Sequence, residues 1–297
     1  MGEMVRLADA LIEVLRGIER VCGSDDSLLG LPTGFPDLDR VTTGFHPGDL
    51  IVVGARPAVG KTALCLGIAQ HVALREGVGV VVLSLEMSKE QVAMRLLCSE
   101  ARVGLAGVRT GQLADRDFSR LATAAGRLAD APLYIDDTPA LAVTDIPSKV
   151  QRVKRQCPNL GLVIVDYIQL LRVDAVSEGD DEVAIISRSL KALAQSLGIP
   201  VIAVSQLSAQ VETRNPPIPT HVDLPGTGSL EADADVVLYL YREDYYNELT
   251  DRRGLADLIV AKQRNGAEAY VPLAFRPEIA RFDSAILESE GPYAEAR

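Results

Sequence analysis

GDLIVVGARPAVGKT, residues 48–62, is the stretch that decides the fold of this 297-residue chain. Asp49–Val53 is a short apolar, β-branched run typical of a buried strand, and an amphipathic helix is predicted to follow Thr62. A strand, a glycine-bearing loop and a helix in this order form a phosphate-binding loop, because backbone N–H groups of the loop and the helix N-terminus surround the phosphates. The alternative is a chance glycine-rich turn before a core helix, and the flanking strand and helix argue against it.

Individual residues of this loop are candidates for binding a nucleotide and its metal ion. We expect Lys61 to reach the β- and γ-phosphates and the Thr62 hydroxyl to ligate Mg²⁺. The other cofactor-binding candidates of the loop are Arg56, Ala58, Gly60 and Ala63. The usual pattern G-x-x-x-x-G-K-[ST] is broken at one position, because Ala55 stands where the first glycine is expected and Gly54 lies one position early. A residue as small as alanine should still fit there.

Composition indicates an ordinary globular protein. Hydrophobic residues make up 47% of the chain and there is no Trp, so the core must be built from Val, Leu, Ile and Ala. The formal net charge of -11 argues against an indiscriminate nucleic-acid coat, although a local basic channel can coexist with an acidic exterior. Net charge alone therefore does not identify the partner.

Cysteine spacing favours a reducing compartment. The cysteines are widely spaced and form no C-x-x-C pair, which favours reduced, buried thiols over disulfides or zinc ligands. They are Cys22, Cys65, Cys98 and Cys157. No apolar run approaches the roughly 18 residues of a membrane span, and residues 1–20 lack the features of a signal peptide. We therefore expect a cytoplasmic protein with no membrane partner.

The chain is predicted to have three parts. Residues 1–29 form a helix and a flexible linker, residues 30–284 one large α/β domain, and residues 285–297 a tail. The helix, over residues 4–20, carries a single apolar stripe. The stripe consists of Leu7, Leu11, Leu15 and Ile18. It must be buried somewhere, and the sequence leaves open whether it docks on a neighbouring subunit or on its own domain.

Polar side chains follow three other predicted strands at their C-terminal ends, where ligands bind in an open α/β sheet. Asp166 ends an apolar run and is expected to hold Mg²⁺ directly or through water. Glu86 follows another strand, and a capping-box pattern from Ser88 fixes its position. It is either a catalytic carboxylate or a solvated loop residue. Gln206 either senses a γ-phosphate or only satisfies backbone groups.

The last third of the domain begins with a long connection. Residues 207–229 carry Pro, Thr and Gly, and a connection of this length is usually functional or disordered. Strands are predicted at residues 236–241, 255–262 and 269–275. KQRNG, residues 262–266, lies between the last two and is predicted to form a hairpin turn with two cations beside it.

The chain resembles the C-terminal ATPase domain of the DnaB-type replicative helicases from about Gly34 to Asp283. The segments that carry the resemblance occur in the family's order and are ARPAVGKT, SLEM, RTGQL, YIDD, DYIQLL, SRSLKALA, VSQL, EADAD and KQRNG. The resemblance implies an α/β fold with a RecA-like P-loop NTPase core and a mainly parallel central sheet. It also implies that a separate N-terminal linker helix precedes this core.

Catalytic roles follow from the resemblance. It implies that Lys61 and Thr62 bind phosphate and Mg²⁺ and that Asp166 supports the Mg²⁺. Glu86 is implied to activate the attacking water. Gln206 is implied to couple the γ-phosphate to the DNA side. The implied cofactors are ATP and Mg²⁺.

Further roles concern neighbouring subunits and partners. The resemblance implies that Lys262 and Arg264 reach the nucleotide of the neighbouring subunit, with Arg264 as the arginine finger. It implies a homo-oligomer that forms a hexameric ring on single-stranded DNA. A primase and a helicase loader are further partners that it suggests.

Two departures from the family pattern matter. Full-length members carry an N-terminal helical domain that contacts primase, so we expect either a truncated form or a natural short relative. The loop DLPGTG, residues 223–228, stands where the family has D-L-R-E-S-G, a loop that contacts the DNA backbone. Pro225 and Gly226 replace the charged side chains, while Gly226 and Gly228 let a strand approach closely. These three residues are the DNA-binding candidates.

Two functions remain open. The first is an ATP-driven helicase motor that moves 5′-to-3′ on single-stranded DNA, with the direction implied by the resemblance. The second is a regulatory RecA/KaiC-like ATPase assembly that binds protein partners and does not translocate. The KQRNG and SRSLKALA segments favour the first function, and the altered loop at residues 223–228 favours the second.

Overall fold

The protein is described from a computed structural model over residues 6–22, 28–174, 181–226, 228–264 and 266–285. The strands found there form one nine-stranded sheet in the order β3-β2-β4-β5-β1-β6-β7-β8-β9. Their bounds are β1 (Leu50–Ala55), β2 (Gly79–Ser84), β3 (Leu133–Asp136), β4 (Leu160–Asp166), β5 (Val201–Gln206), β6 (Val236–Tyr241), β7 (Leu255–Gln263), β8 (Ala269–Arg276) and β9 (Arg281–Ser284).

The sheet is parallel from β3 to β6 and antiparallel from β6 to β9. β1 lies in its middle, where Ile51 is opposite Ile202 of β5 on one side and Val236 of β6 on the other. The predicted fold class, with a mainly parallel central sheet, is confirmed. Because β1, β2, β4 and β5 run in one direction, the residues that follow them meet at one edge of the sheet.

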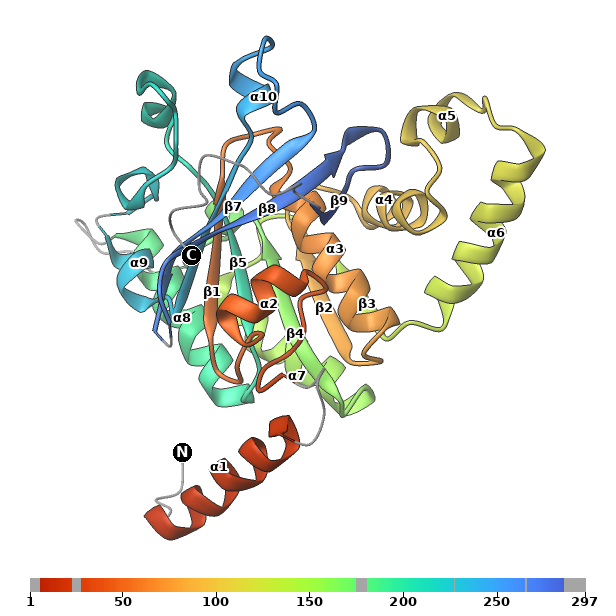
Figure 1. The fold of residues 1–297 in the computed structure, drawn as a ribbon. Helices are drawn as coiled ribbons and strands as arrows, with labels where there is room; N and C mark the ends of the chain where they lie inside the picture. The colour runs from red at the N-terminus through yellow and green to blue at the C-terminus, as the bar shows by residue number, and fades with distance from the viewer. Residues whose placement is uncertain (1–5, 23–27, 175–180, 227, 265, 286–297) are drawn as a thin grey trace.

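Helices cover both faces of the sheet (Figure 1). One face carries α2 (Pro36–Thr42), α3 (Lys61–Leu74) and α4 (Lys89–Ala101), and the other carries α7 (Ile146–Gln156), α8 (Glu182–Leu197) and α9 (Ser229–Asp233). The side chains of β1 alternate between the two cores, since Ile51 and Val53 pack beneath α3 while Leu50 and Val52 pack beneath α8. Both faces of β1 are therefore buried, which explains why its sequence is continuously apolar.

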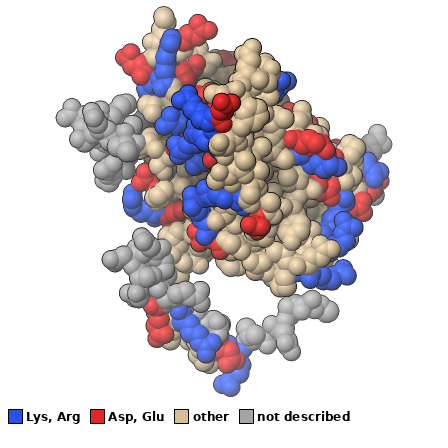
Figure 2. Space-filling model, turned by 90° about the vertical axis from the view of Figure 1, so that its right-hand side faces the viewer, with Lys and Arg blue, Asp and Glu red and all other residues tan. Residues whose placement is uncertain are grey.

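A helical arm extends from the β3 edge of the sheet (Figure 1). It consists of α5 (Leu105–Thr110) and α6 (Asp115–Ala129), which pack with the end of α4 around a small core of their own. Arg116, Arg120 and Arg127 of α6 are exposed. Figure 2 views this side of the protein and shows Lys and Arg side chains gathered in a patch.

The predicted N-terminal helix is present as α1 (Leu7–Cys22). Figure 1 shows that it stands apart from the sheet and its helices. Leu7, Leu11 and Leu15 are 74%, 49% and 57% exposed, so these leucines are not packed on their own domain. Packing in cis, one of the two alternatives for this stripe, is therefore not observed. The linker predicted after the helix falls on residues 23–27, which lie outside the described residues.

The sequence analysis missed several short elements, namely α2, α5, α9, α10 (Glu243–Tyr246) and β9. α2 is only seven residues long and has no side-chain hydrogen bond at its N-cap, so its sequence carries little of the signal by which a helix start is recognised. β9 is a four-residue edge strand whose existence depends on pairing with β8, for example Phe282 opposite Phe275. Such pairing is set by tertiary context more than by local sequence. The long connection also contains two short 3₁₀ turns, η3 (Ala209–Thr213) and η4 (His221–Asp223).

The cysteine prediction is confirmed where the structure describes the side chains. Cys65, Cys98 and Cys157 are free and buried. Among the described helices, none combines the length and the apolar character that crossing a membrane requires.

Candidate nucleotide-binding site

The phosphate loop leaves the end of β1 and enters α3 at Lys61. Gly60 has φ 120°, and a Cβ atom there would lie 2.8 Å from the ring of Phe282, so only glycine fits. Ala58 also adopts a left-handed backbone conformation, with φ 61°. Ala55 is fully buried as the last residue of β1, which agrees with the expectation that a small residue fits at this position.

Four side chains converge at this loop, two from the start of α3, one from the segment after β2 and one from the end of β4. The Lys61 Nζ lies 3.2 Å from Glu86 Oε2 and 3.8 Å from Asp166 Oδ1. The hydroxyl of Thr62 donates a 2.6 Å hydrogen bond to Asp166 Oδ2. The capping box predicted at the start of α4 is present, with Ser88 accepting from the N–H of Gln91, and it fixes the segment that carries Glu86. Loop, helix and strand ends thus bring these predicted residues together.

Asp166 has the properties expected of a metal ligand. Asp166 as a whole is 4% exposed, and its Oδ1 has no hydrogen-bond partner among the described residues. Burial raises the pKa of Asp166, although the nearby Lys61 ammonium and the Thr62 hydrogen bond act in the opposite direction. A buried carboxylate oxygen without a hydrogen bond fits Mg²⁺, which is commonly held by one or two protein oxygens together with substrate phosphates.

Gln206 lies at the end of β5, where its backbone is clasped by Gln169. The Gln169 amide nitrogen donates to Gln206 O over 2.9 Å, and the Gln206 N–H donates to Gln169 Oε1 over 3.3 Å. The Gln206 side-chain amide has no hydrogen-bond partner in the part of the chain that the structure describes. The two hydrogen bonds from Gln169 therefore orient the end of β5, and the side-chain amide of Gln206 can bond to a ligand.

Arg56 occupies the phosphate loop, but its guanidinium is bonded to the segment after β5. Nη1 donates to Leu207 O and Nε pairs with Glu212 Oε1, both over 2.8 Å. The side chain of Arg56 is 14% exposed. Of the other cofactor-binding candidates, Ala63 is a buried residue of the first turn of α3.

Lys262 and Arg264 lie at the opposite end of the sheet from the phosphate loop. Lys262 lies near the end of β7, opposite Val237, and Arg264 directly follows β7, next to the start of β1. Arg264 Nε pairs with Asp235 Oδ1 over 3.1 Å. β1 has six residues at roughly 3.3 Å each, so about 20 Å separates Arg264 from the phosphate loop of its own chain.

The ammonium group of Lys262 is bonded to backbone carbonyls at the end of α9. It donates to Glu231 O over 2.6 Å and to Ala234 O over 2.8 Å. Burial lowers the pKa of Lys262, with the neighbouring Arg264 acting in the same direction. The structure therefore ties both cations to their own chain.

The three DNA-binding candidates lie on a surface loop before α9. Gly226 and Gly228 are exposed and Pro225 is half-buried. Gly226 has φ 82°, and a Cβ atom added there would lie 3.1 Å from the Asp181 carboxylate at the N-cap of α8. Thr227 lies outside the described residues. A side chain at position 226 would therefore be strained by the backbone conformation and would crowd Asp181.

Sequence reasoning missed an arginine and an aromatic ring beside the phosphate loop. Arg242, which follows β6, donates to Val59 O over 3.4 Å, and its guanidinium lies 4.3 Å from the centre of the Phe275 ring. Phe275 in turn packs on Phe282, with ring centroids 4.5 Å apart. No local motif marks these residues, because β8 and β9 reach the loop only through the folding of the sheet.

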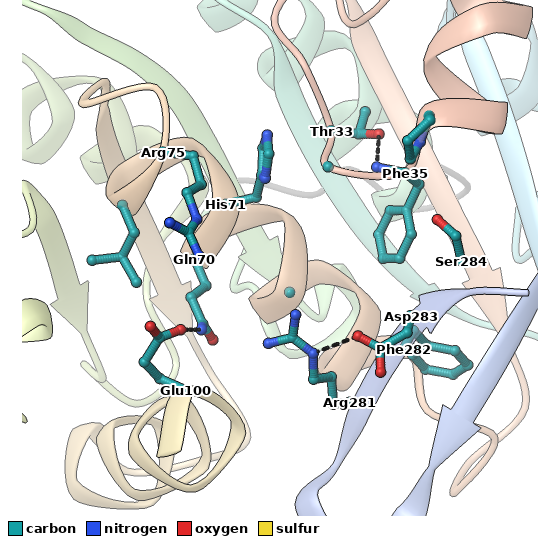
Figure 3. A pocket seen from close by; sticks show the side chains of 14 residues that line it. Thr33, Phe35, Gln70, His71, Arg75, Glu100, Arg281, Phe282, Asp283 and Ser284 are labelled. Carbon is teal, nitrogen blue, oxygen red and sulfur yellow. Dashed lines mark hydrogen bonds and ion pairs between the residues drawn. The ribbon is translucent and has the colours of Figure 1, made fainter. Parts of the chain in front are cut away.

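A separate hollow of about 340 Å³ lies along α3, away from the phosphate loop (Figure 3). Three of its charged groups have partners, since Glu100 is paired with Gln70 and Arg127 while Arg281 is paired with Asp283 over 2.7 Å. It includes His71 and Arg75 from the C-terminal half of α3, whereas the phosphate loop lies at the N-terminus of that helix. We assign the chemistry to the phosphate loop and not to this hollow.

The central β1 strand, the phosphate loop with Lys61 and Thr62, and a carboxylate at the end of β4 define a RecA-like P-loop NTPase. The chain belongs to the family described as DnaB-like helicase C terminal domain, which matches residues 30–284. The fold and the resemblance stated from the sequence are thereby confirmed.

Individual relatives agree with this assignment. The chain is 45% identical to the replicative DNA helicase DnaB of Geobacillus stearothermophilus over 95% of its length and 62% of that protein. It is 44% identical to the replicative DNA helicase DnaC of Bacillus subtilis (strain 168) over 93% of its length and 61% of that protein. The chain therefore spans about three fifths of the length of these relatives.

Solved structures are similar as well. One of them, the structure of an ATPase domain, aligns with a TM-score of 0.89 at 33% identity, over 96% of this chain and 100% of that one. A DnaB-like replicative helicase, described together with its interactions with primase, aligns with a TM-score of 0.84 at 34% identity, over 94% of this chain and 67% of that one.

Proposed function

We propose that this protein is the ATPase motor of a replicative-type DNA helicase, which hydrolyses ATP between the subunits of a ring and translocates 5′-to-3′ on single-stranded DNA. The observation that carries the proposal is the separation of the phosphate loop and Arg264 at opposite ends of one sheet. A finger that lies about 20 Å from its own phosphate loop suits a site completed by a second copy of the chain.

The chemistry at the phosphate loop is phosphoryl transfer to water. The Lys61 ammonium binds the β- and γ-phosphates, and the Glu86 carboxylate, which is half exposed, takes a proton from the attacking water. Thr62 and Asp166 are the residues that would hold Mg²⁺, which when bound neutralises charge developing on the phosphates. Nucleotide use follows from the family, and we propose ATP and Mg²⁺ as the cofactors.

Two further groups complete the site in this proposal. The flat face formed by Arg242 and Phe275 next to the loop suits stacking of a nucleotide base. The free amide of Gln206, at the edge where the γ-phosphate would lie, is assigned to sensing that phosphate.

Assembly follows from the same separation. Arg264 acts as the arginine finger for the neighbouring copy. Lys262 exchanges its hydrogen bonds at the end of α9 for contact with the same nucleotide. The exposed leucines of α1 give a second reason for assembly, because a neighbouring copy would cover them. We propose a hexameric homo-oligomer by similarity to the DnaB family, and the copy number can be measured by native mass spectrometry.

Partners other than ATP are also proposals. We assign Pro225, Gly226 and Gly228 to contact with the backbone of single-stranded DNA. One structural relative is described with primase, and we extend contact with a primase and a helicase loader to the protein of which this motor is part. The reduced, buried cysteines support a cytoplasmic site of action.

The test is ATP hydrolysis measured with and without single-stranded DNA, together with displacement of a labelled strand from a forked duplex. The proposal predicts that single-stranded DNA stimulates ATP hydrolysis. It also predicts that a forked duplex is unwound only when the strand encircled by the ring has a free 5′ tail. Lys61→Ala serves as the inactive control. Hydrolysis that single-stranded DNA leaves unchanged would instead support the regulatory RecA/KaiC-like assembly, which the comparisons with known proteins do not favour.

A further inference from the structure

The phosphate loop is bonded directly to the segment that follows β5. The Leu207 N–H donates to Ala55 O over 3.1 Å, and Arg56 returns a 2.8 Å hydrogen bond to Leu207 O. A second arm of the same guanidinium pairs with Glu212 of η3 over 2.8 Å. An arginine that forms part of the phosphate loop is thus anchored in the connection that leads toward the proposed DNA loop.

Both ends of η3, at Ser208 and at Arg214, are bonded to Asp223 at the start of that DNA loop. The Ser208 N–H donates to Asp223 O over 2.8 Å, and Arg214 pairs with the Asp223 carboxylate. Arg214 also donates to Ile218 O over 2.9 Å, and the Thr220 N–H donates to Asp223 over 2.8 Å. The side chain of Asp223 is fully buried. A continuous set of polar contacts therefore runs from Arg56 through η3 to a residue two positions before Pro225.

Aromatic rings pack beside the Arg56–Glu212 pair. Tyr246 lies against Tyr241 with ring centroids 5.8 Å apart and meets Tyr245 edge-on at 4.9 Å. Burial raises the pKa of Tyr246 to about 12, with the Glu212 carboxylate acting in the same direction and the Arg56 guanidinium in the opposite one. The side chain of Arg56 is 14% exposed and that of Glu212 is 40% exposed, so the pair is shielded from water mainly at the guanidinium.

We propose that Glu212 is a positioning residue that couples the state of the phosphate loop to the loop around Pro225 and Gly226. By holding the Arg56 guanidinium, Glu212 makes η3 follow the phosphate loop when nucleotide is bound or hydrolysed. η3 then shifts Asp223 and the residues after it. The inference rests on the proposed function, because it assumes that residues 225 and 226 contact DNA. Coupling of this kind is reciprocal, so DNA must change nucleotide affinity by the same factor as nucleotide changes DNA affinity.

The variant Glu212→Gln tests this inference, because it keeps the shape of the side chain and removes the charge that holds Arg56. Glu248→Gln is the matched control, since Glu248 is an exposed carboxylate outside this set of contacts. Two quantities are measured for each protein: ATP hydrolysis with and without single-stranded DNA, and the affinity for single-stranded DNA with a non-hydrolysable ATP analogue and with ADP.

For Glu212→Gln we expect hydrolysis without DNA to stay within about twofold of the unsubstituted protein. Stimulation by DNA, and the ratio of the two DNA affinities, should each fall by about 5-fold or more, the lower range of typical coupling factors. The control should match the unsubstituted protein in all of these. Glu212→Asp, which restores the charge on a shorter side chain, should recover part of the lost coupling.

Three results would overturn the inference. If the unsubstituted protein is stimulated by DNA and Glu212→Gln is stimulated equally, Glu212 does not couple the sites. If Glu212→Gln lowers hydrolysis by one factor with and without DNA, the residue only supports the phosphate loop. If the unsubstituted protein itself ignores DNA, the proposed function fails and the inference fails with it, which separates this case from the other two.

Hydrogen–deuterium exchange gives a measurement that needs no substitution. Adding the non-hydrolysable analogue to the unsubstituted protein without DNA should change exchange of the amides from Leu207 to Leu224 as well as those of the phosphate loop. Protection confined to the phosphate loop, with the rate at residues 207–224 unchanged, would contradict the coupling even if the Glu212 variants failed to fold.

Discussion

The charged side chains at the two ends of the central sheet differ in how far they are buried and in what surrounds them. At the phosphate end, the Lys61 side chain is 9% exposed and that of Asp166 is 6% exposed, and both are assembled around a space for phosphate. At the other end, Arg264 is 55% exposed and pairs with Asp235 of its own chain. The first end is organised in advance, whereas the second holds a half-exposed cation whose ion-pair partner is a carboxylate of its own chain. We infer that one copy carries two halves of different sites.

Asp235 accepts from hydrogen-bond donors other than Arg264, so breaking the Arg264–Asp235 ion pair costs little free energy. Its Oδ2 also accepts from Lys191 over 2.5 Å and from the Leu50 N–H over 2.7 Å. In the proposed assembly Arg264 turns toward a neighbouring copy, and the buried carboxylate then keeps these two partners, which avoids the cost of an unpaired buried charge. Under this proposal, Asp235 holds the Arg264 side chain in the free subunit.

The largest effect is expected from Arg264→Ala. Removing an arginine finger costs roughly 10³ to 10⁵ in rate in other phosphoryl-transfer systems, and the residue lies too far from its own phosphate loop to affect nucleotide binding within its subunit. We expect hydrolysis to fall within this range while nucleotide affinity measured by fluorescence titration stays near that of the unsubstituted protein. A variant that hydrolyses ATP normally would remove Arg264 from the site.

Glu86→Gln should follow, with hydrolysis reduced roughly 10²- to 10⁴-fold because an amide cannot take the proton of the attacking water. Nucleotide binding should persist, since Glu86 offers no positive charge to the phosphates. Lys61→Ala is the comparison, because it removes the cation and should weaken binding as well. Equal loss of binding in both variants would show that Glu86 has no catalytic role.

Asp166→Asn separates metal binding from folding. Because the Asp166 carboxylate is buried and one of its oxygens has no hydrogen bond, replacing it with a neutral amide should raise the melting temperature of the nucleotide-free protein. Saturating Mg²⁺ and nucleotide should raise the melting temperature of the unsubstituted protein by roughly 5–10 °C. In the Asp166→Asn variant, most of this rise in melting temperature should be lost. Calorimetry with and without Mg²⁺ measures both shifts, and a full Mg²⁺-dependent rise in the variant would exclude Asp166 as a ligand.

Pro225→Arg should have the smallest effect. An added guanidinium at the DNA loop supplies one phosphate contact per subunit, worth about 0.7 units of salt slope for single strands. Both the affinity for single-stranded DNA and its salt dependence should therefore rise modestly. A salt titration in which neither changes, with ring assembly intact, would mean that this loop does not contact DNA and would favour a non-translocating ATPase.

The phosphate end could be predicted from sequence because its residues follow local patterns. Gly60, Lys61 and Thr62 are consecutive, and Asp166 marks the end of an apolar run, so strand order alone brings them together. Their presence at one edge agrees with the prediction, while the catalytic roles assigned to them remain predictions.

The contacts of the remaining residues could not be predicted because they depend on pairing over long distances in sequence. Arg56 and Glu212 are 156 residues apart, and no periodicity links them. The ion pair between Arg264 and Asp235 likewise depends on the antiparallel pairing of β6 and β7. A side chain can be placed at a strand end from sequence, but its partner becomes visible only when the sheet is assembled.

The central claim, that each catalytic site is shared between two copies, is tested most directly by mixing Arg264→Ala subunits with Lys61→Ala subunits. In random 1:1 rings, about a quarter of the boundaries join an intact phosphate loop to an intact finger. We predict that hydrolysis by the mixture clearly exceeds the sum of the two variants measured separately. If native mass spectrometry shows mixed rings and hydrolysis does not exceed that sum, Arg264 does not act on the neighbouring copy and the claim is contradicted.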